Sequence, residues 1–181
     1  MRRNGIAVLL AAVVLSAPFS DALGFDGNRE GFILGFGGGY GGLFEITQNA
    51  YNDASGKGVL TELVIGHGVS KQWLIHYSGR QIWGSTKGIL YTAVFPSVAA
   101  THFHRDKSPS IYEMGSLGIA AAGDVAIEGG RGGGVAGPAA FLGIGYEAKR
   151  GFGFELVGGV LGSVDNGTYG AVGLTMKLLA Y

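Results

Sequence analysis

The sequence predicts an all-β protein, an eight-stranded antiparallel up-and-down β-barrel that crosses a membrane after a cleaved signal peptide. Three observations lead to this fold class: an N-terminal export signal, apolar residues at every second position in repeated segments, and glycine at 36 of 181 positions. Alternation with a period of two residues is typical of β-strands with one apolar face. Strands that cross a membrane must close into a barrel, because a closed barrel leaves no backbone polar group unpaired in lipid.

The first 24 residues have the anatomy of a secretory signal peptide. Two arginines precede the apolar run Gly5–Ala17, and small residues follow near Ser20 and Ala22. The run is shorter than the about 20 residues that a transmembrane helix needs. We therefore expect residues 1–24 to be removed, with cleavage near 22–24, after export through the general secretory pathway. Residues 25–181 then form a single barrel domain.

Composition excludes several classes of protein. Loss of Arg2, Arg3 and Asp21 leaves 11 basic and 12 acidic residues, so the charge does not indicate a nucleic-acid partner. The chain has no cysteine, which excludes a disulfide framework and an acylated N-terminal cysteine. Glycine does not follow the three-residue repeat of collagen. We expect it to fill a narrow lumen and tight turns.

Eight segments show the alternation, and each predicts one strand. In each segment large apolar residues occupy one parity, whereas glycine, small, polar or charged residues occupy the other. Polar or glycine-rich stretches separate the segments, as expected for turns. The predicted strands are, in order, Gly31–Gly42, Val59–His67, Gln72–Ile82, Gly88–Ala100, Ile111–Ala122, Ala136–Ala148, Phe152–Val160 and Val172–Leu178.

The parity of the large residues predicts which side chains point outward. In the fourth strand, Pro96 predicts an edge, a bulge or an early end, because proline cannot donate to a strand ladder. The fifth strand has few large residues, so its facing stays open. Glu62 and Arg80 are predicted to point into the lumen. The residues predicted to point outward are Phe32, Leu34, Phe36, Tyr40, Val59, Thr61, Leu63, Ile65, Trp73, Ile75, Tyr77, Ile89, Tyr91, Ala93, Phe95, Leu142, Ile144, Tyr146, Phe152, Phe154, Leu156, Val160, Val172, Leu174, Met176 and Leu178.

The connections alternate between two ends of the barrel, and the outer set is predicted to be the longer one, as in transmembrane barrels. The glycine run Gly129–Gly134 lacks the strand, helix and Lys-Ser/Thr context of a phosphate-binding loop, so we interpret it as part of a mobile outer loop. The predicted outer loops are Thr47–Gly58, Ser78–Lys87 and Gly123–Gly134, and the predicted inner turns are Gly68–Lys71, His104–Ser110 and Glu147–Gly151.

The last hairpin allows a prediction of register. Even positions are apolar in both of its strands, which a two-residue turn cannot provide. A three-residue loop, Asp165-Asn166-Gly167, satisfies the parity, with Gly167 in a left-handed conformation. Pairing Val164 with Thr168 then places Glu155 opposite Lys177 in the lumen. Because buried charges are tolerated when paired, this register predicts an internal ion pair.

The signal peptide, eight amphipathic strands, short inner turns and terminal Tyr181 resemble the small bacterial outer-membrane barrels of the OmpA-like and opacity-protein type. The resemblance implies a place in the outer membrane of a Gram-negative-type bacterium, contact with outer-membrane lipid and lipopolysaccharide, and insertion by the barrel assembly machinery. Such chains usually end in an aromatic residue on the apolar face of the last strand. Here the apolar positions are even and Tyr181 is odd, so the terminal signal departs from the simplest form.

A second, local resemblance concerns Ile75-His76-Tyr77-Ser78, which is similar to the His-x-Ser motif of the outer-membrane lipid A 3-O-deacylase. It implies that Ser78 is a nucleophile and His76 its base, with Glu62 as the candidate orienting acid. Residues i and i+2 of a strand share one face, as this chemistry requires. If residue 67 pairs with residue 71, Glu62 lies opposite His76. The alternation points these side chains into the lumen, which favours a structural polar network over catalysis.

His102-Phe103-His104 places two imidazoles on one strand face, a spacing compatible with a metal ion. Asp106 is a candidate third ligand. The competing interpretation is a solvated strand end beside an inner turn. No cofactor is indicated elsewhere in the chain.

Together these features predict a non-enzymatic envelope barrel whose lumen is filled by side chains and whose outer loops contact surfaces or ligands. One alternative is a lipid ester hydrolase that uses His76 and Ser78. The other is a secreted, soluble, lipocalin-like barrel, in which Phe152, Phe154 and Leu156 would face the interior. The oligomeric state stays open.

Overall fold

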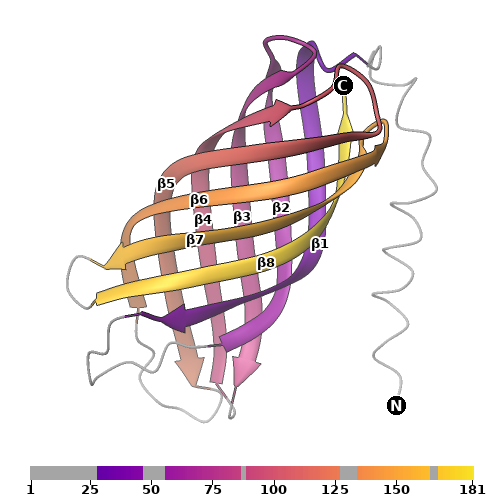
Figure 1. The fold of residues 1–181 in the computed structure, drawn as a ribbon. Coiled ribbons are helices and arrows are strands. Elements are labelled where there is room, and N and C mark those ends of the chain that lie inside the picture. Colours follow the sequence, from indigo (N-terminus) through magenta and orange to yellow (C-terminus); the bar gives the residue numbers. More distant parts are fainter. Residues whose placement is uncertain (1–27, 47–55, 87–88, 127–133, 164–166) are drawn as a thin grey trace, which may run out of the picture.

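A computed structural model describes residues 28–46, 56–86, 89–126, 134–163 and 167–181 of the chain. Eight antiparallel strands in sequence order form a closed barrel, because β8 pairs with β1 as well as with β7 (Figure 1). No helix in the described part of the chain is long and apolar enough to cross a membrane. The predicted fold class is confirmed. The strands are β1 (Gly31–Glu45), β2 (Gly56–Gly68), β3 (Trp73–Thr86), β4 (Ile89–Phe103), β5 (Ser110–Ala126), β6 (Gly134–Lys149), β7 (Phe152–Ser163) and β8 (Gly167–Ala180).

β1 begins and β8 ends at the same end of the barrel, which we call the terminal end. The turns after β2, β4 and β6 lie there, and the connections after β1, β3, β5 and β7 lie at the opposite end, which we call the far end (Figure 1). The predicted outer loop Ser78–Lys87 is wrong, because only residues 87–88 separate β3 from β4. The alternation of Ser78, Arg80 and Ile82 with outward residues continues through this segment and keeps it in the sheet.

Several sequence predictions fall on residues outside the described part of the chain. These are the signal peptide 1–24, most of the loop Thr47–Gly58, most of the glycine run Gly129–Gly134, and the tip of the last hairpin at 164–166.

Large apolar side chains cover the outside of the barrel. The predicted outward facing is confirmed for strands β1, β2, β3, β6, β7 and β8, whose predicted residues are exposed or half-exposed. In β7, Phe154 and Leu156 are 45% and 52% exposed. This facing is the reverse of that in a soluble lipocalin-like barrel, in which the same residues would line the interior.

The predicted facing of β4 is wrong. Tyr91, Ala93 and Phe95 are buried in the lumen, where the Phe95 ring packs edge-on against Phe141 with 5.2 Å between centroids. The even positions of β4 from Leu90 to Val98 are also apolar, except for Thr92. Because both faces of this strand are mainly apolar, its parity is set by packing in the lumen and not by hydrophobicity. The side chain of Ile89 is outside the described set.

The remaining open points in β4 and β5 are settled by their pairing. β4 continues past Pro96 to Phe103, and its pairing with β5 skips only the two residues between Val94 and Ser97 while the register on either side is the same. In β5 the odd positions point outward, with Leu117 72% exposed, and the even positions Tyr112, Met114, Ser116 and Ala120 are buried.

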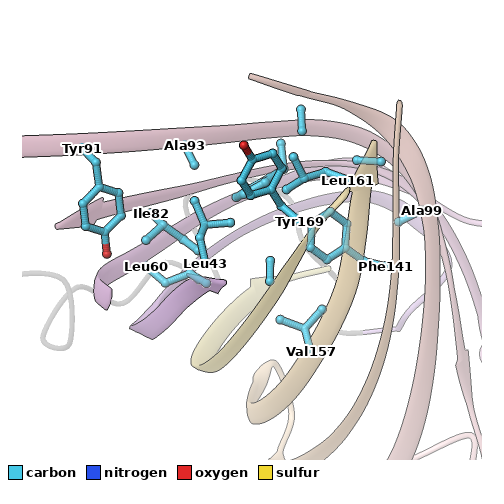
Figure 2. Packing of buried hydrophobic residues seen from close by; sticks show 14 of the residues in the cluster. Leu43, Leu60, Ile82, Tyr91, Ala93, Ala99, Phe141, Val157, Leu161 and Tyr169 are labelled. Atoms are coloured by element: carbon cyan, nitrogen blue, oxygen red, sulfur yellow. The ribbon is translucent and has the colours of Figure 1, made fainter. Parts of the chain in front are cut away.

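The lumen is filled by two apolar clusters. The larger extends from the far end of the barrel to Ala99 and Met114, and Figure 2 shows its side chains converging from different strands. The smaller lies at the terminal end and consists of Ile33, Leu74, Phe103, Tyr112 and Tyr181. A cavity of about 10 Å³ beside the larger cluster has room for about one water molecule. The larger cluster includes Leu43, Leu60, Ile82, Tyr91, Phe95, Met114, Phe141, Val157, Leu161 and Tyr169.

Aromatic rings in the lumen lie over glycines of neighbouring strands. A Cβ atom at Gly145 would lie 2.0 Å from the ring of Tyr112, and one at Gly159 would lie 2.2 Å from the ring of Phe141. The two residues of each pair are direct cross-strand partners. The prediction that glycine fills a narrow lumen is confirmed at these positions.

The register of the last hairpin differs from the prediction by one pair. Ser163 pairs with Gly167, so the intervening residues are 164–166 and Gly167 belongs to β8. Glu155 therefore lies opposite Thr175, and Lys177 lies opposite Gly153. The predicted parity is correct, because the facing restricts the register only to steps of two residues.

Candidate functional site

Four charged side chains form a closed ring of ion pairs in the lumen. Arg80 of β3 lies 2.9 Å from Glu62 of β2 and 3.0 Å from Glu155 of β7. Lys177 of β8 lies 2.9 Å from Glu62 and 2.8 Å from Glu155. We call this group the ion ring. Its two positive and two negative charges balance where little solvent screens them. The predicted lumenal position of all four residues, and the predicted ion pair between Glu155 and Lys177, are confirmed.

The strand register explains how the ring forms. Lys177, Gly37, Glu62 and Arg80 are successive cross-strand partners on β8, β1, β2 and β3. A Cβ atom at Gly37 would lie 3.2 Å from Cβ of Glu62 and 3.6 Å from Cγ of Lys177. Since Gly37 has no side chain, the carboxylate of Glu62 and the ammonium of Lys177 meet across β1.

Ser78 joins the ion ring, but His76 does not. The Ser78 hydroxyl donates to Glu62 Oε1 at 2.6 Å. The hydrogen bonds of His76 in the described chain join Nε2 to the Thr101 hydroxyl at 2.9 Å and Nδ1 to the carbonyl of Tyr77 at 3.3 Å. All three candidate catalytic residues, Glu62, His76 and Ser78, are buried in the lumen.

The predicted pairing of residue 67 with residue 71 is wrong. Residues 69–72 lie between β2 and β3, Gly66 pairs with His76, and Glu62 pairs with Arg80. The carboxylate that was expected to orient His76 is therefore held by Arg80, Lys177 and Ser78. This arrangement is a polar network, and a catalytic role for the three residues remains a prediction from sequence alone.

A second buried ion pair closes the terminal end of the barrel. Arg29, just before β1, pairs with Glu147 of β6, and its guanidinium lies 3.8 Å from the ring centroid of Phe103. The guanidinium also donates to the carbonyls of Lys71 at 3.1 Å and Arg105 at 2.6 Å. Because Lys71 and Arg105 belong to two different turns, Arg29 ties the start of the barrel to both.

Glu147 collects the remaining groups at this end. Its carboxylate accepts hydrogen bonds from the hydroxyls of Ser108 and Tyr181, and from the backbone N–H of Gly151 at 3.1 Å. A bulge in β6 follows Glu147, and Gly151 has a φ of 69° in the turn to β7. A Cβ atom there would lie 2.0 Å from the carbonyl oxygen of Leu179, so this position favours glycine. Tyr181 is buried in the lumen, in agreement with its odd parity.

The two histidines of the predicted metal site lie on the outside of the barrel, at the terminal end. Between them, Phe103 is fully buried, so the alternation turns both imidazoles outward. Glu113 of β5 faces them, with Oε1 3.1 Å from Nδ1 of His102 and Oε2 3.4 Å from Nε2 of His104. The third candidate donor is therefore Glu113, and Asp106 is not part of the group.

The sequence matches no protein-family model and no curated protein. Among solved structures, Ail, the attachment invasion locus protein of Yersinia pestis, has 16% sequence identity and a TM-score of 0.53 over 83% of this chain and 99% of that chain. Neisserial surface protein A (NspA) has 13% identity and a TM-score of 0.60 over 83% and 97%. The N-terminal β-barrel domain of Pseudomonas aeruginosa OprF has 14% identity and a TM-score of 0.52 over 83% and 98%. The fold is that of the small outer-membrane β-barrels.

The four residues of the ion ring are predictable as lumenal from the sequence, and so is the pair of Glu155 and Lys177, but the other three ion pairs and the network at the terminal end are not. Arg29 precedes the first predicted strand and Glu147 begins a predicted inner turn, so the sequence does not predict that either side chain is buried. Parity does indicate the burial of Glu147 and Tyr181, because both are at odd positions, which carry the lumen-facing residues of β6 and β8. Glu113 was missed because the facing of β5 was open.

Proposed function

We propose that this chain is an outer-membrane barrel of a bacterial envelope, without enzymatic activity and with a lumen closed by its own side chains. The observation that carries this function is the facing of the strands, with large apolar side chains outside and ion pairs inside. Outer-membrane barrels present an apolar band about 25 Å tall to the hydrocarbon of the bilayer. A soluble monomer rarely exposes so large an apolar surface.

Outward aromatic residues support the same placement. Trp73 and Tyr146 lie towards the terminal end of the barrel, and Tyr40 and Trp83 lie towards the far end. Tryptophan and tyrosine are enriched at the two membrane interfaces, because each has an apolar ring and a polar group. The four residues therefore fit the two aromatic girdles of a membrane-spanning barrel.

The two ends of the barrel then face different compartments. Because the strand number is even, β1 begins and β8 ends at the terminal end, which we place in the periplasm. The far end faces the outside of the cell, and on this proposal the connections after β1 and β5 contact surfaces or ligands. Ail is named for attachment and invasion, and one of its structures is a complex with the heparin analogue sucrose octasulfate, which supports such a role. On this proposal, the apolar belt contacts outer-membrane lipid and lipopolysaccharide, and the barrel assembly machinery inserts the chain.

The absence of enzymatic activity is supported by the site geometry. A lipid hydrolase needs a nucleophile that lipid reaches, whereas Ser78 is fully buried in the lumen and hydrogen-bonded to Glu62. Overexpression of the wild type and of Ser78→Ala, followed by mass analysis of lipid A, is expected to give the same acylation in both strains. Loss of an acyl chain in the wild-type strain alone would overturn this part of the proposal.

Membrane placement is tested by cell fractionation, with gel mobility of the outer-membrane fraction before and after boiling. We expect the protein in that fraction, with a mobility shift on heating because a closed barrel resists detergent until heated. Exposed lysines give the orientation: a membrane-impermeant amine reagent should label Lys57 in intact cells. Lys71, Lys107 and Lys149 should react only after the outer membrane is permeabilised. A soluble protein without a shift, or the reverse labelling pattern, would refute the placement.

A further inference from the structure

We infer that His102, His104 and Glu113 form a binding site for a divalent transition-metal ion of the zinc class, on the outer surface of the barrel at its terminal end. One donor atom from each of these side chains lies within 4.8 Å of the donors of the other two. The site is separate from the ion ring and from the network of Arg29 and Glu147, both of which lie inside the barrel.

The backbone places the three side chains on one face. His102 is the direct cross-strand partner of Glu113, and His104 follows two residues after His102 with the buried Phe103 between them. The His104 N–H donates to the carbonyl of Ile111 at 3.0 Å, which continues the hairpin one step beyond β4. The donors are thus carried by paired backbone and not by a free loop.

The donor geometry is close to that of a metal site. In tetrahedral zinc sites the ligand atoms lie about 2.0–2.2 Å from the ion, and hence about 3.3–3.6 Å from each other. The two imidazole-to-carboxylate separations here are 3.1 Å and 3.4 Å. These separations run to the two different carboxylate oxygens of Glu113, and one donor from each residue lies within 4.8 Å of the others. Side-chain rotation would bring the three donors to one ion, with water completing the coordination as in zinc sites with three protein ligands.

The electrostatics of the cluster favour a cation. Among the described residues, the ion-pair contacts of Glu113 are with these two imidazoles and with no lysine or arginine. Two imidazole nitrogens and one carboxylate are a donor set that suits zinc, copper and nickel. A cation between them would be coordinated by a nitrogen lone pair of each ring and attracted by the negative charge of the carboxylate.

Trp73 holds one ligand in place and provides a readout. Its indole stacks on the His102 ring, with 4.6 Å between centroids and 29° between planes. The chain has only two tryptophans, so in a Trp83→Phe background Trp73 is the sole source of indole fluorescence. Paramagnetic Cu²⁺ at the site should quench it.

The experiment uses tag-free protein refolded in detergent, with the heat-dependent gel shift as the check of folding for each variant. Calorimetric titration with Zn²⁺ is expected to show one ion per chain. His102→Ala, His104→Ala and Glu113→Gln should each weaken binding at least 10-fold, because loss of a group that merely supports a metal ligand already costs about 10–100-fold. Copper should quench Trp73 saturably, and zinc should compete with it.

His67→Ala is the matched control, since His67 is exposed on β2 but is not part of the cluster. It should leave zinc affinity and copper quenching unchanged. Absence of saturable zinc binding to the folded wild type would overturn the site. The site would also be overturned if zinc affinity were unchanged in both His104→Ala and Glu113→Gln, or if it fell as much in His67→Ala as in these variants.

Discussion

At the scale of single residues, the interior of this barrel depends on balanced charges. In the described part of the chain, six charged side chains are buried, and every one of them pairs with an opposite charge. Removing one partner of such a group leaves another charge uncompensated in a region of low dielectric, which costs more than the intact pair contributes. The six residues are Arg29, Glu62, Arg80, Glu147, Glu155 and Lys177.

Arg80→Met tests the ion ring. The substitution leaves Glu62 and Glu155 with Lys177 as their only cation, so we expect the free energy of unfolding to fall by about 3–5 kcal/mol. Urea unfolding of the refolded protein in detergent measures this change. Arg105→Met is the control, because the Arg105 side chain is exposed in the turn after β4, and it should have little effect. Equal stability of the two variants would contradict a stabilising role for the ring.

At the scale of elements, the sequence of a strand specifies which of its faces points outward more strongly than it specifies the register with its neighbours. β1, β2, β3 and β6 to β8 differ enough between their two faces that the sequence predicts which one meets the membrane. β4 is mainly apolar on both faces, and β5 alternates small residues with a few large ones, so neither parity stands out in these two strands. Their facing follows from the neighbours with which they pair.

The facing of β5 is tested by Leu117→Arg. Leu117 is 72% exposed on the outside of the barrel, in the middle of its strand. Arginine at the midplane of an outer-membrane barrel costs about 2–4 kcal/mol, and near the interface about 0–1 kcal/mol. Val69→Arg, in the turn after β2, provides the interfacial control. Urea titration in lipid vesicles should show the difference, and equal costs at the two sites would show that Leu117 does not face lipid.

At the scale of the whole molecule, the barrel is closed twice over. Around its circumference, β1 pairs with β8 from Leu34 with Ala180 to Glu45 with Tyr169. Along its axis, the lumen is filled by an apolar cluster, the ion ring and a second apolar cluster that the pair of Arg29 and Glu147 seals. Eight strands enclose a space just wide enough for side chains, so an aqueous channel is not expected.

Planar-bilayer recording tests this closure. The purified wild-type protein should insert without stepwise, sustained conductance, whereas a general porin in the same chamber should conduct. Insertion is verified by the heat-dependent gel shift of protein recovered from vesicles of the same lipid. Stable single-channel openings of the wild type would show that the clusters in the lumen leave a continuous path for ions.

The number of strands, closure into a barrel, the facing of six strands, and the lumenal position of Glu62, Arg80, Glu155 and Lys177 are all predictable from the sequence. These properties depend on alternation within single short segments, because the residues of each segment show which face of that strand is apolar. Tertiary structure alone decided the register, the facing of β4 and β5, and the groups that meet at the terminal end.

The physical reason is that facing restricts register only to steps of two residues. The choice among those steps depends on the turns and on how side chains from all eight strands fill one lumen. Thus Glu62 meets Arg80 and not His76, and Glu113 completes the pair of histidines in place of Asp106. Arg29, Glu147 and Tyr181 are far apart in the chain, and only closure of the barrel brings them together.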